Sequence, residues 1–443
     1  MNPLDWFLGI VYALIFYTLA SRNAAKYSNN RLYTLYYLKG FRYKLVGMFG
    51  FVAIYLFYYK GGDSTNFFYA TSPLYKFAFT NPSRFFEFIF SQDFYPWECI
   101  TEAKKQGVGY ITKGSAALTT IKIGAIVNLF TFNSYIALCV VFSYISYSFQ
   151  WKAFQLITSV YPSLHKQLAF AFLMIPSVIF WGSGYGKDVV MFSCIMQFFY
   201  SFYTAFIFKK NALRHVIILL AIGYIMSLIR GFILLTILPC CVLMAAIYYR
   251  SAIQNSLMRF LIGPIFVLGG LAGSYLMVQN LGSTVQSYNL ESLEQKAEGF
   301  RSWHTTQGGS TYSIEGDITS VSGVLSQAPK AMVITLFGPF VWEIRNIVML
   351  LSGIESIIFL YLFTTKVFFN RKVYALFGVL IREHILMFCI PFVLILSVAI
   401  GLTSFNYGAL VRYKIPILPF FACTFIIINY HLTRSAAQKI VVK

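Results

Sequence analysis

The chain has 443 residues, of which 58% are hydrophobic and 11% are charged, and its formal net charge is +20. These charged residues are too few for the surface of a soluble protein of this length, so the composition excludes that class and indicates a protein surrounded by lipid. The basic residues stand in short clusters between apolar runs, a pattern typical of membrane topogenesis and not of a nucleic-acid-binding face.

From the amino terminus onwards, apolar runs recur that are long enough to cross about 30 Å of hydrocarbon, alone or with modest tilt. The first run follows Asp5 without a basic leader, which predicts a retained helix and not a signal peptide. We therefore expect an all-α fold, a single polytopic bundle of transmembrane helices over residues 1–443 with about eleven crossings. The predicted crossings are 4–20, 45–59, 133–155, 167–183, 189–208, 214–228, 231–249, 259–278, 346–368, 384–402 and 415–431.

The lysines and arginines of the short connections predict the orientation, because such residues stay on the cytoplasmic side. The basic connections share one side if the amino terminus is outside, and most acidic residues, which were not used to set the topology, then fall outside. We expect a multi-pass protein of the bacterial cytoplasmic (inner) membrane with a periplasmic amino terminus and a cytoplasmic carboxyl terminus. The first two basic clusters are Arg22, Lys26, Arg31, Lys39, Arg42 and Lys44, and then Lys209, Lys210 and Arg214.

Two long segments fall on the outer side, residues 60–132 and residues 279–345. The first carries aromatic stretches such as 85–90, which are typical of helices that lie flat on a membrane. Residues 116–131 are apolar, but a crossing there would invert every later connection, so we predict an amphipathic or re-entrant helix at the outer interface. The second segment is rich in Ser, Thr and Gly and predicts an ordered cap or a mobile lid.

The sharpest local motif is Lys60-Gly61-Gly62-Asp63-Ser64, at the outer end of the second crossing. Two glycines let the backbone turn sharply and approach a ligand, and low-dielectric surroundings can raise the pKa of an aspartate toward that of a general base. Asp63 is therefore a candidate catalytic residue. The alternative is a glycine turn that ends a helix beside a solvated carboxylate.

Two further features near the outer side carry charge. Residues 181–188 form a turn with three glycines that ends in Lys187 and Asp188. Lys187 can bind an anionic headgroup and Asp188 can cap the next helix, with capping alone as the alternative. Arg230 separates two apolar half-runs, and an arginine inside a membrane costs about 2.5–3.5 kcal/mol, which favours a functional role over simple snorkelling.

The last outer connection contains Arg412 and Lys414, followed by Pro416 and Pro419. Arg412 can hold a phosphate through two hydrogen bonds and Lys414 can add a point charge, so a diphosphate on a lipid carrier fits this sequence. Binding of an ordinary anionic phospholipid is the alternative. Three other polar residues are candidates: Glu343 and Arg345, which could pair with each other or with Arg412, and Glu355, which lies half-way along a helix as a proton relay or a paired carboxylate.

Taken together, these motifs resemble the polytopic glycosyltransferases with the GT-C fold and related bacterial surface-polysaccharide polymerases, including uncharacterised members from the Bacteroidetes. The resemblance rests on Asp63 in the first outer segment and the interfacial helices after it, on residues 176–188 and on residues 411–416. It implies that Asp63 is the general base and that Asp188 orients the acceptor or a metal. It also implies that Arg230, Arg412 and Lys414, assisted by Lys187, hold the lipid phosphate and stabilise its charge as it leaves.

The resulting expectation is a membrane glycosyltransferase that uses a polyprenyl-phosphate- or diphosphate-linked sugar at the outer face. Its partners would be the lipid-linked donor, membrane lipids and a glycan, lipid or protein acceptor, with no nucleic acid. A divalent cation could take part, but the sequence requires none, and its cysteines lack metal-ligand spacing. The alternatives are a polysaccharide polymerase or ligase, which would depend more on arginines, and a non-enzymatic transporter or flippase of lipid-linked glycans.

Overall fold

The computed structural model describes residues 2–91, 94–109, 111, 115–250, 269, 312, 314, 321–369, 378–379 and 383–441. Every regular element in these ranges is a helix, which confirms the predicted all-α class. The predicted crossing at 259–278, apart from residue 269, and most of the predicted outer segment 279–345 lie outside the described residues.

Several helices are long and apolar enough to cross a membrane, which supports a multi-pass membrane protein. Two further candidates are bent pairs, so the described residues contain six such helices, or eight if each pair is one span. The six are Pro3–Lys26, Tyr33–Tyr58, Lys187–Ile207, Ala212–Tyr249, Met349–Val367 and His384–Ser404, and the bent pairs are Ala116–Phe130 with Tyr135–Val160 and Tyr407–Tyr413 with Ile417–Thr433.

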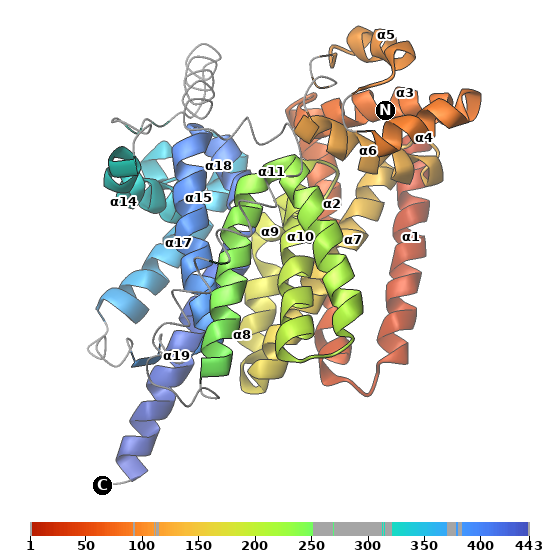
Figure 1. Ribbon diagram of the computed structural model, residues 1–443. Coiled ribbons are helices and arrows are strands. Elements are labelled where there is room, and N and C mark those ends of the chain that lie inside the picture. Colours follow the sequence, from red (N-terminus) through yellow and green to blue (C-terminus); the bar gives the residue numbers. More distant parts are fainter. Residues whose placement is uncertain are drawn as a thin grey trace. The chain divides into compact units, whose positions relative to one another are not determined.

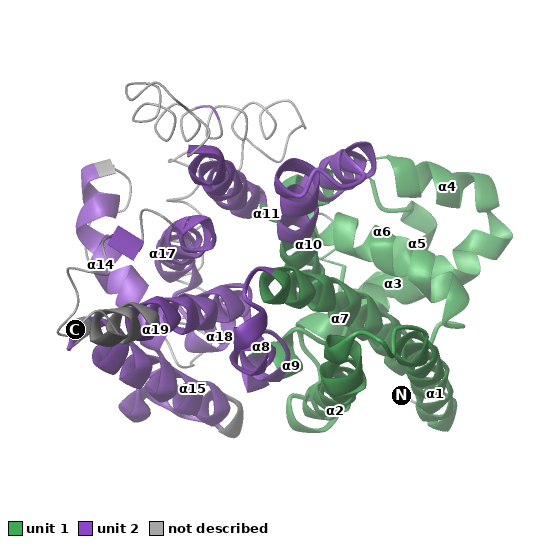
Figure 2. Ribbon diagram, turned by 90° about the horizontal axis from the view of Figure 1, so that it is seen from below, with its two compact units in different colours: residues 1–159, 178–197, 224–230 green, residues 160–177, 198–223, 231–443 purple. Residues whose placement is uncertain are grey.

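The chain divides into two compact units that are interleaved along the sequence (Figure 2). Unit 1 comprises residues 1–159, 178–197 and 224–230, and unit 2 comprises residues 160–177, 198–223 and 231–443. The candidate residues Asp63, Lys187, Asp188 and Arg230 belong to unit 1, and Glu343, Arg345, Arg412 and Lys414 belong to unit 2.

Unit 1 combines long helices with a set of shorter ones that lie across one of their ends (Figure 1). The long helices are α1 (Pro3–Lys26), α2 (Leu38–Ala53), which continues as the π-helical turn η2 (Ile54–Tyr58), and α7 (Tyr135–Val160). The helices across their end are α3 (Asp63–Thr80), α4 (Pro82–Phe90) and α6 (Ser115–Phe130), and α5 (Trp97–Lys105) packs on α3.

The predicted interfacial segment 116–131 corresponds to α6, which meets α7 at an angle of 109°. The corner between them is tight because Phe132 and Asn133 have positive φ angles, 51° and 56°. Asn128 is fully buried there, and its amide nitrogen donates to the Asn133 side-chain oxygen at 2.8 Å. α6 therefore turns sharply away from the direction of α7 at a corner held by side-chain hydrogen bonds.

One basic residue that the sequence analysis assigned to the cytoplasmic connections lies inside unit 1. Lys44 is 1% exposed, and its Nζ atom is 3.5 Å from the Val178 carbonyl oxygen and 5.1 Å from the centre of the Phe192 ring. The sequence analysis placed Lys44 in a connection before the crossing 45–59, whereas it lies within α2, on the same buried face of the helix as Gly40 and Gly47.

The 38-residue helix α11 (Ala212–Tyr249) consists of two arms. A straight helix of this length would measure about 57 Å, nearly twice the thickness of the hydrocarbon layer. Arg230 has non-helical backbone angles, φ −150° and ψ 79°, and interrupts the helix. The Tyr249 hydroxyl donates to the Phe206 carbonyl oxygen, and Lys209 Nζ lies 5.3 Å from the Tyr249 ring. Because the end of α11 lies beside the residues that precede its start, the helix turns back on itself, with Arg230 at the tip.

Unit 2 contains the remaining long helices, and phenylalanine rings fill its core. Phe199 of α10 (Lys187–Phe202) lies 4.6 Å from Phe388 and 5.2 Å from Phe420 between ring centres. Such clusters bury large apolar areas in favourable tilted or edge-on geometries. The helices of this unit include α14 (Val321–Phe337), α15 (Ile347–Phe363) with η10 (Thr364–Phe368), α17 (His384–Ser404), α18 (Tyr407–Tyr413), α19 (Ile417–Val441), and α8 (His165–Ala169) with η5 (Phe170–Met174).

Candidate functional site

In unit 1, the turn before α3 has an unusual backbone. The φ angles of Lys60, Gly61 and Gly62 are 52°, 143° and 121°, a conformation that glycine adopts without the steric cost of a Cβ atom. Asp63 follows as the exposed first residue of α3, where a carboxylate is favoured by the positive end of the helix dipole. This geometry agrees with the reading of a helix boundary, and the role of Asp63 as a base stays a prediction.

Ser64, the second residue of α3, is hydrogen-bonded to the predicted turn at residues 181–188. Its hydroxyl donates to the Tyr185 carbonyl oxygen at 2.6 Å. Lys187 Nζ lies 5.2 Å from the centre of the Phe67 ring, on the first turns of α3. The residues that flank Asp63 and Lys187 are therefore neighbours in space, although more than a hundred residues separate them in the sequence.

Asp188 and Arg230 form an ion pair in unit 1. The Nη2 atom of Arg230 donates to Oδ1 of Asp188 at 2.6 Å, and the two side chains are 14% and 20% exposed. A charge-assisted hydrogen bond compensates the cost of keeping two charges with so little solvent access. The pair also joins the first turn of α10 to the tip of α11, so it brings together two residues that the sequence analysis selected separately.

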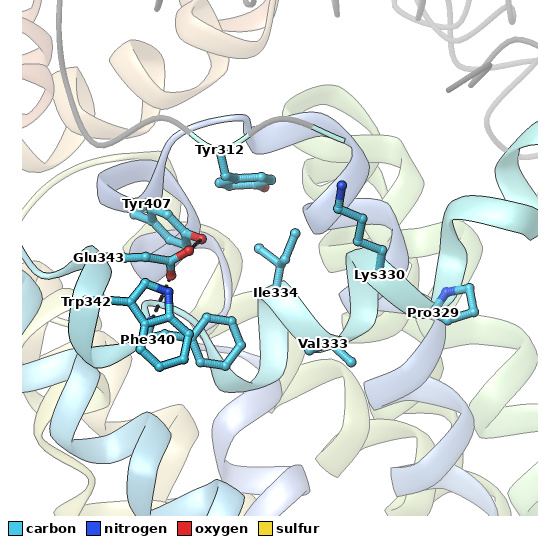
Figure 3. Close-up of a pocket in the computed structure, with 9 residues that line it drawn as sticks. All are labelled: Tyr312, Pro329, Lys330, Val333, Ile334, Phe340, Trp342, Glu343 and Tyr407. Atoms are coloured by element: carbon cyan, nitrogen blue, oxygen red, sulfur yellow. Dashed lines mark hydrogen bonds between the residues drawn. The ribbon is translucent and has the colours of Figure 1, made fainter. Parts of the chain in front are cut away.

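In unit 2, a cavity of about 650 Å³ lies among aromatic, basic and acidic side chains, a volume that suits a small-molecule ligand. We call it the aromatic pocket. In Figure 3, Glu343 and Tyr407 lie on one side and Lys330 on the other, with Ile334 between them. The residues that line it are Tyr312, Pro329, Lys330, Val333, Ile334, Phe340, Trp342, Glu343 and Tyr407.

Glu343 is fixed by two donors in this pocket. Its Oε2 atom accepts from the Phe340 N–H at 2.8 Å, and its Oε1 atom accepts from the Tyr407 hydroxyl. The rings of Phe340 and Trp342 stack with their centres 5.1 Å apart and their planes 7° apart, while Trp342 remains 80% exposed. A carboxylate held in place beside an open aromatic face can bind a ligand that has both hydroxyl groups and an apolar face.

Tyr312 completes the pocket from a part of the chain far from Glu343 in sequence. Its N–H donates to the Phe405 carbonyl oxygen at 3.2 Å, and its hydroxyl donates to the Gly401 carbonyl oxygen at 2.9 Å. Its ring centre lies 5.0 Å from that of Tyr407. Burial raises the pKa of the Tyr312 hydroxyl above its usual value, so this side chain is a neutral donor at physiological pH.

No family model, curated protein or solved structure matches the chain. The function therefore has to be argued from the geometry of the residues. In the described part of the chain, no group of three or more His, Cys, Asp or Glu residues could hold a metal ion. The described site residues offer hydrogen bonds, charge and aromatic stacking.

The other predicted residues of unit 2 lie near the aromatic pocket in sequence but differ in burial. Lys414 is 1% exposed, and its Nζ atom donates to the Gly338 carbonyl oxygen at 2.6 Å and to the Ser356 hydroxyl at 3.1 Å. Arg412 is half-buried in the last turn of α18, and Arg345 is exposed. Their contacts with a lipid phosphate stay predictions.

The sequence analysis did not single out Tyr312, Lys330, Trp342 or Tyr407. A usable signal was present for Trp342, because residues 340–343 place two aromatic residues and an acid within four positions outside any long apolar run. Tyr312 carried no such signal, because its contact with Tyr407 joins residues that are 95 positions apart in the sequence.

Proposed function

We propose that the chain is a membrane glycosyltransferase that uses a sugar linked to a polyprenyl phosphate or diphosphate at the outer face of the bacterial cytoplasmic membrane. The observation that carries the proposal is the aromatic pocket. A sugar ring presents C–H groups on its faces and hydroxyls at its edge, which suits the exposed ring of Trp342 for stacking and Glu343, held by the Tyr407 hydroxyl, for accepting hydrogen bonds. In this proposal, the pocket binds the sugar part of a lipid-linked glycan.

The proposed topology has eleven crossings, an amino terminus outside and a carboxyl terminus inside. In unit 1, contacts support this by joining predicted outer residues: Asp5 accepts from the Tyr135 N–H at 3.1 Å, and Ser64 lies 2.9 Å from the Tyr135 hydroxyl. The two arms of α11, residues 212–229 and 231–249, measure about 27–29 Å each, the length of one crossing apiece. α3, α4 and α6 would then be the outer interfacial helices.

In unit 2, contacts between predicted inner residues support the same topology. Glu383 accepts from the Tyr161 hydroxyl at 2.8 Å and lies 3.2 Å from His431 Nε2. The Tyr203 hydroxyl lies 2.8 Å from His384 Nε2. In the proposed topology, Tyr161, Tyr203, Glu383, His384 and His431 all lie near the cytoplasmic ends of their crossings. The contacts between them therefore agree with that topology.

The proposed reaction is an inverting displacement. Asp63 takes the proton from an acceptor hydroxyl, the acceptor oxygen forms a bond to the anomeric carbon, and the bond to the lipid phosphate breaks with its electron pair leaving on the phosphate. Asp188 orients the acceptor or a divalent cation, and Lys187 and Arg230, which also belong to unit 1, stabilise the leaving phosphate. Of the candidates in unit 2, the proposed role of Glu343 and Arg345 is to bind the glycan and that of Arg412 is to bind the lipid phosphate, whereas Lys414 is buried and donates to Gly338 and Ser356.

A polysaccharide polymerase or ligase is the second candidate within the same substrate class. Three residues of the aromatic pocket, Tyr312, Lys330 and Trp342, come from the second long outer segment of the sequence. A long outer segment at this place resembles those of polymerases and ligases, which favours this candidate. Such an enzyme would depend on Arg412 more than on Asp63.

The test is complementation of cells that lack the protein, with the length and amount of surface glycan as the readout. Asp63→Asn should reduce glycan at least tenfold if it is the base, because general-base catalysis contributes about 10²–10⁴-fold. Glu102→Gln, which removes another exposed carboxylate of unit 1, is the matched control and should retain full activity. Full-length glycan from a stably expressed Asp63→Asn variant would refute the role of Asp63, and loss only with Arg412→Ala would select the polymerase or ligase.

The aromatic pocket has its own test in the same assay. Trp342→Ala should reduce glycan severalfold, because the variant loses the stacking face of the pocket. Trp97→Ala is the control, since Trp97 is another outward-facing tryptophan, 68% exposed compared with 80% for Trp342. Equal activity of the two variants would contradict the proposed sugar-binding role.

A further inference from the structure

A second cavity of unit 2, with a volume of about 690 Å³, runs between three helical segments. We call it the α15 groove. Residues of α15 at helical spacing line one wall, Leu351, Glu355, Ile358 and Leu362, and α19 provides the opposite wall. α8 and η5 supply the third side, which includes Phe170. The volume lies within the range of ligand-binding pockets.

The apolar part of the α15 groove is open to the surroundings of the helices. Phe170 is 50% exposed, and Ile354 and Ile358 of α15 are 48% and 46% exposed. α15 belongs to the membrane-span candidate Met349–Val367. Hydrocarbon is therefore the medium outside this part of the groove, so a ligand can enter with its chain from the lipid side.

Glu355 is the polar residue in the deep part of this groove. It is 5% exposed, and its Oε1 atom accepts from the Ser177 N–H at 2.5 Å. The Ser177 hydroxyl also interacts with this carboxyl group, but the Oε2 atom has no hydrogen-bond partner among the described residues. A buried acceptor atom without a partner is unfavourable, because the hydrogen bonds that it made to water have not been replaced at that atom. A ligand that donates one hydrogen bond at this point would remove that cost.

The surroundings of Glu355 determine which donor fits. Lys414 interacts electrostatically with Glu355, and its ammonium group is held 3.1 Å from the hydroxyl of the adjacent Ser356. The positive charge that balances the carboxylate is therefore part of the protein. A second cation would meet the field of Lys414, and an anion would meet the carboxylate itself, so an uncharged donor fits best.

We propose that the α15 groove binds a lipid alcohol, a long hydrocarbon chain that ends in a hydroxyl group. The hydroxyl donates to the free Oε2 atom of Glu355, and the chain lies along the apolar walls formed by Phe170, Ile358 and Ala422. This site is distinct from the aromatic pocket and does not depend on the proposed transferase activity.

The test uses the full-length protein in lipid nanodiscs and a long-chain primary alcohol that carries a photoactivatable diazirine in its chain. Labelled peptides are identified by mass spectrometry. We expect labelling in η5, α15 and α19, at least tenfold above that by a probe with the same chain but no hydroxyl. Chains with a terminal amine or phosphate should label less than the alcohol. Equal labelling by the hydrocarbon probe, or stronger labelling by either charged probe, would overturn the proposal.

Two variants and a control locate the binding. Glu355→Leu should remove the preference for the alcohol over the hydrocarbon probe. Ala422→Phe fills the groove without touching the Ser177 hydrogen bond, so it should reduce labelling at least tenfold even if Glu355→Leu fails to fold. Leu14→Phe, on an exposed position of α1, should leave labelling unchanged. Unchanged labelling of the Ala422→Phe variant would show that the alcohol binds elsewhere.

Discussion

The ion pair between Asp188 and Arg230 joins two of the predicted site residues of unit 1, and its energy can be measured. The side chains of Arg230 and Asp188 are 14% and 20% exposed, so each charge is stabilised by the other. Removing one partner should therefore weaken the stabilisation of the remaining charge and cost about 2–4 kcal/mol, somewhat less than for a fully buried pair.

The prediction is a double-mutant cycle on thermal unfolding in detergent. Asp188→Asn and Arg230→Gln should each lower the melting temperature, and the double variant should lower it by less than the sum, with a coupling energy of about 1 kcal/mol or more. Additive effects would mean that the contact contributes nothing to stability. A strong coupling would also explain why an arginine is tolerated at the tip of α11.

Cys99 provides a second residue-scale prediction, on reactivity. Burial, with a smaller contribution from Glu98, raises the pKa of the Cys99 thiol to about 12. The reactive thiolate is therefore scarce at pH 8 in the folded protein, where an ordinary thiol would be partly ionised. We expect maleimide to modify Cys99 only after unfolding, as measured by mass spectrometry of the peptide that contains Cys99. Rapid modification of the native protein would show that α5 opens or packs differently.

The sequence predicted the contacts of some site residues but not of others. It selected Asp188 and Arg230 from a helix start and an interrupted apolar run, and the ion pair joins them. It missed the burial of Lys44, because hydropathy reads a lysine near other basic residues as part of a loop. The same local view cannot find Tyr312, whose role follows from a contact with a distant turn.

At the scale of the element, glycines decide how closely helices approach. A Cβ atom on Gly47 of α2 would lie 2.4 Å from the Ile179 carbonyl oxygen, whereas one on Gly50, a turn later, would have its nearest neighbour at 3.9 Å. Small residues at such positions allow close packing of membrane helices. The same substitution can therefore be compared at a crowded position, Gly47, and at an open position, Gly50, of one helix.

Gly47→Ala should destabilise the protein by about 1–3 kcal/mol, the usual cost of overpacking. Gly50→Ala should be neutral or stabilising by up to about 1 kcal/mol, because alanine has the higher helix propensity. The measurement is the melting temperature of each variant in the same detergent. If both variants melt alike, α2 does not pack on residue 179 at the distance described.

Several membrane helices could be predicted from the sequence because hydropathy and length specify them, whereas the predicted crossing 167–183 is divided among α8, η5 and the helix Pro176–Trp181. The interruption at Arg230 between 214–228 and 231–249 coincides with the tip of α11. Residues 116–131 form a helix, α6, as expected, but the reason for its 109° angle to α7 is the corner at Phe132 and Asn133, where two non-glycine residues take positive φ angles. Local propensity does not reveal such a corner, because part of its stabilisation comes from a distant residue: the Asn133 amide nitrogen donates to the Ser72 hydroxyl at 2.9 Å.

At the scale of the whole molecule, the all-helical fold and the multi-pass membrane character follow from composition, because a chain with 11% charged residues must bury its backbone hydrogen bonds in helices within lipid. The division into two interleaved units was not foreseen. The division depends on which helices pack against one another, and the hydropathy of a helix does not say which other helix it will contact. The charged candidate residues were expected to form one site. They belong instead to two units: four of them to unit 1 and four to unit 2.

The central claim is that this chain transfers the sugar of a lipid-linked glycan and that its aromatic pocket binds that sugar. The most direct measurement uses purified protein in proteoliposomes, supplied with lipid-linked glycans extracted from cells that lack it. The account predicts that the wild-type protein releases free lipid phosphate and extends or transfers the glycan, and that Glu343→Gln slows this at least tenfold. It would be contradicted if the wild-type protein moved the intact lipid-linked glycan between leaflets without breaking the bond to phosphate.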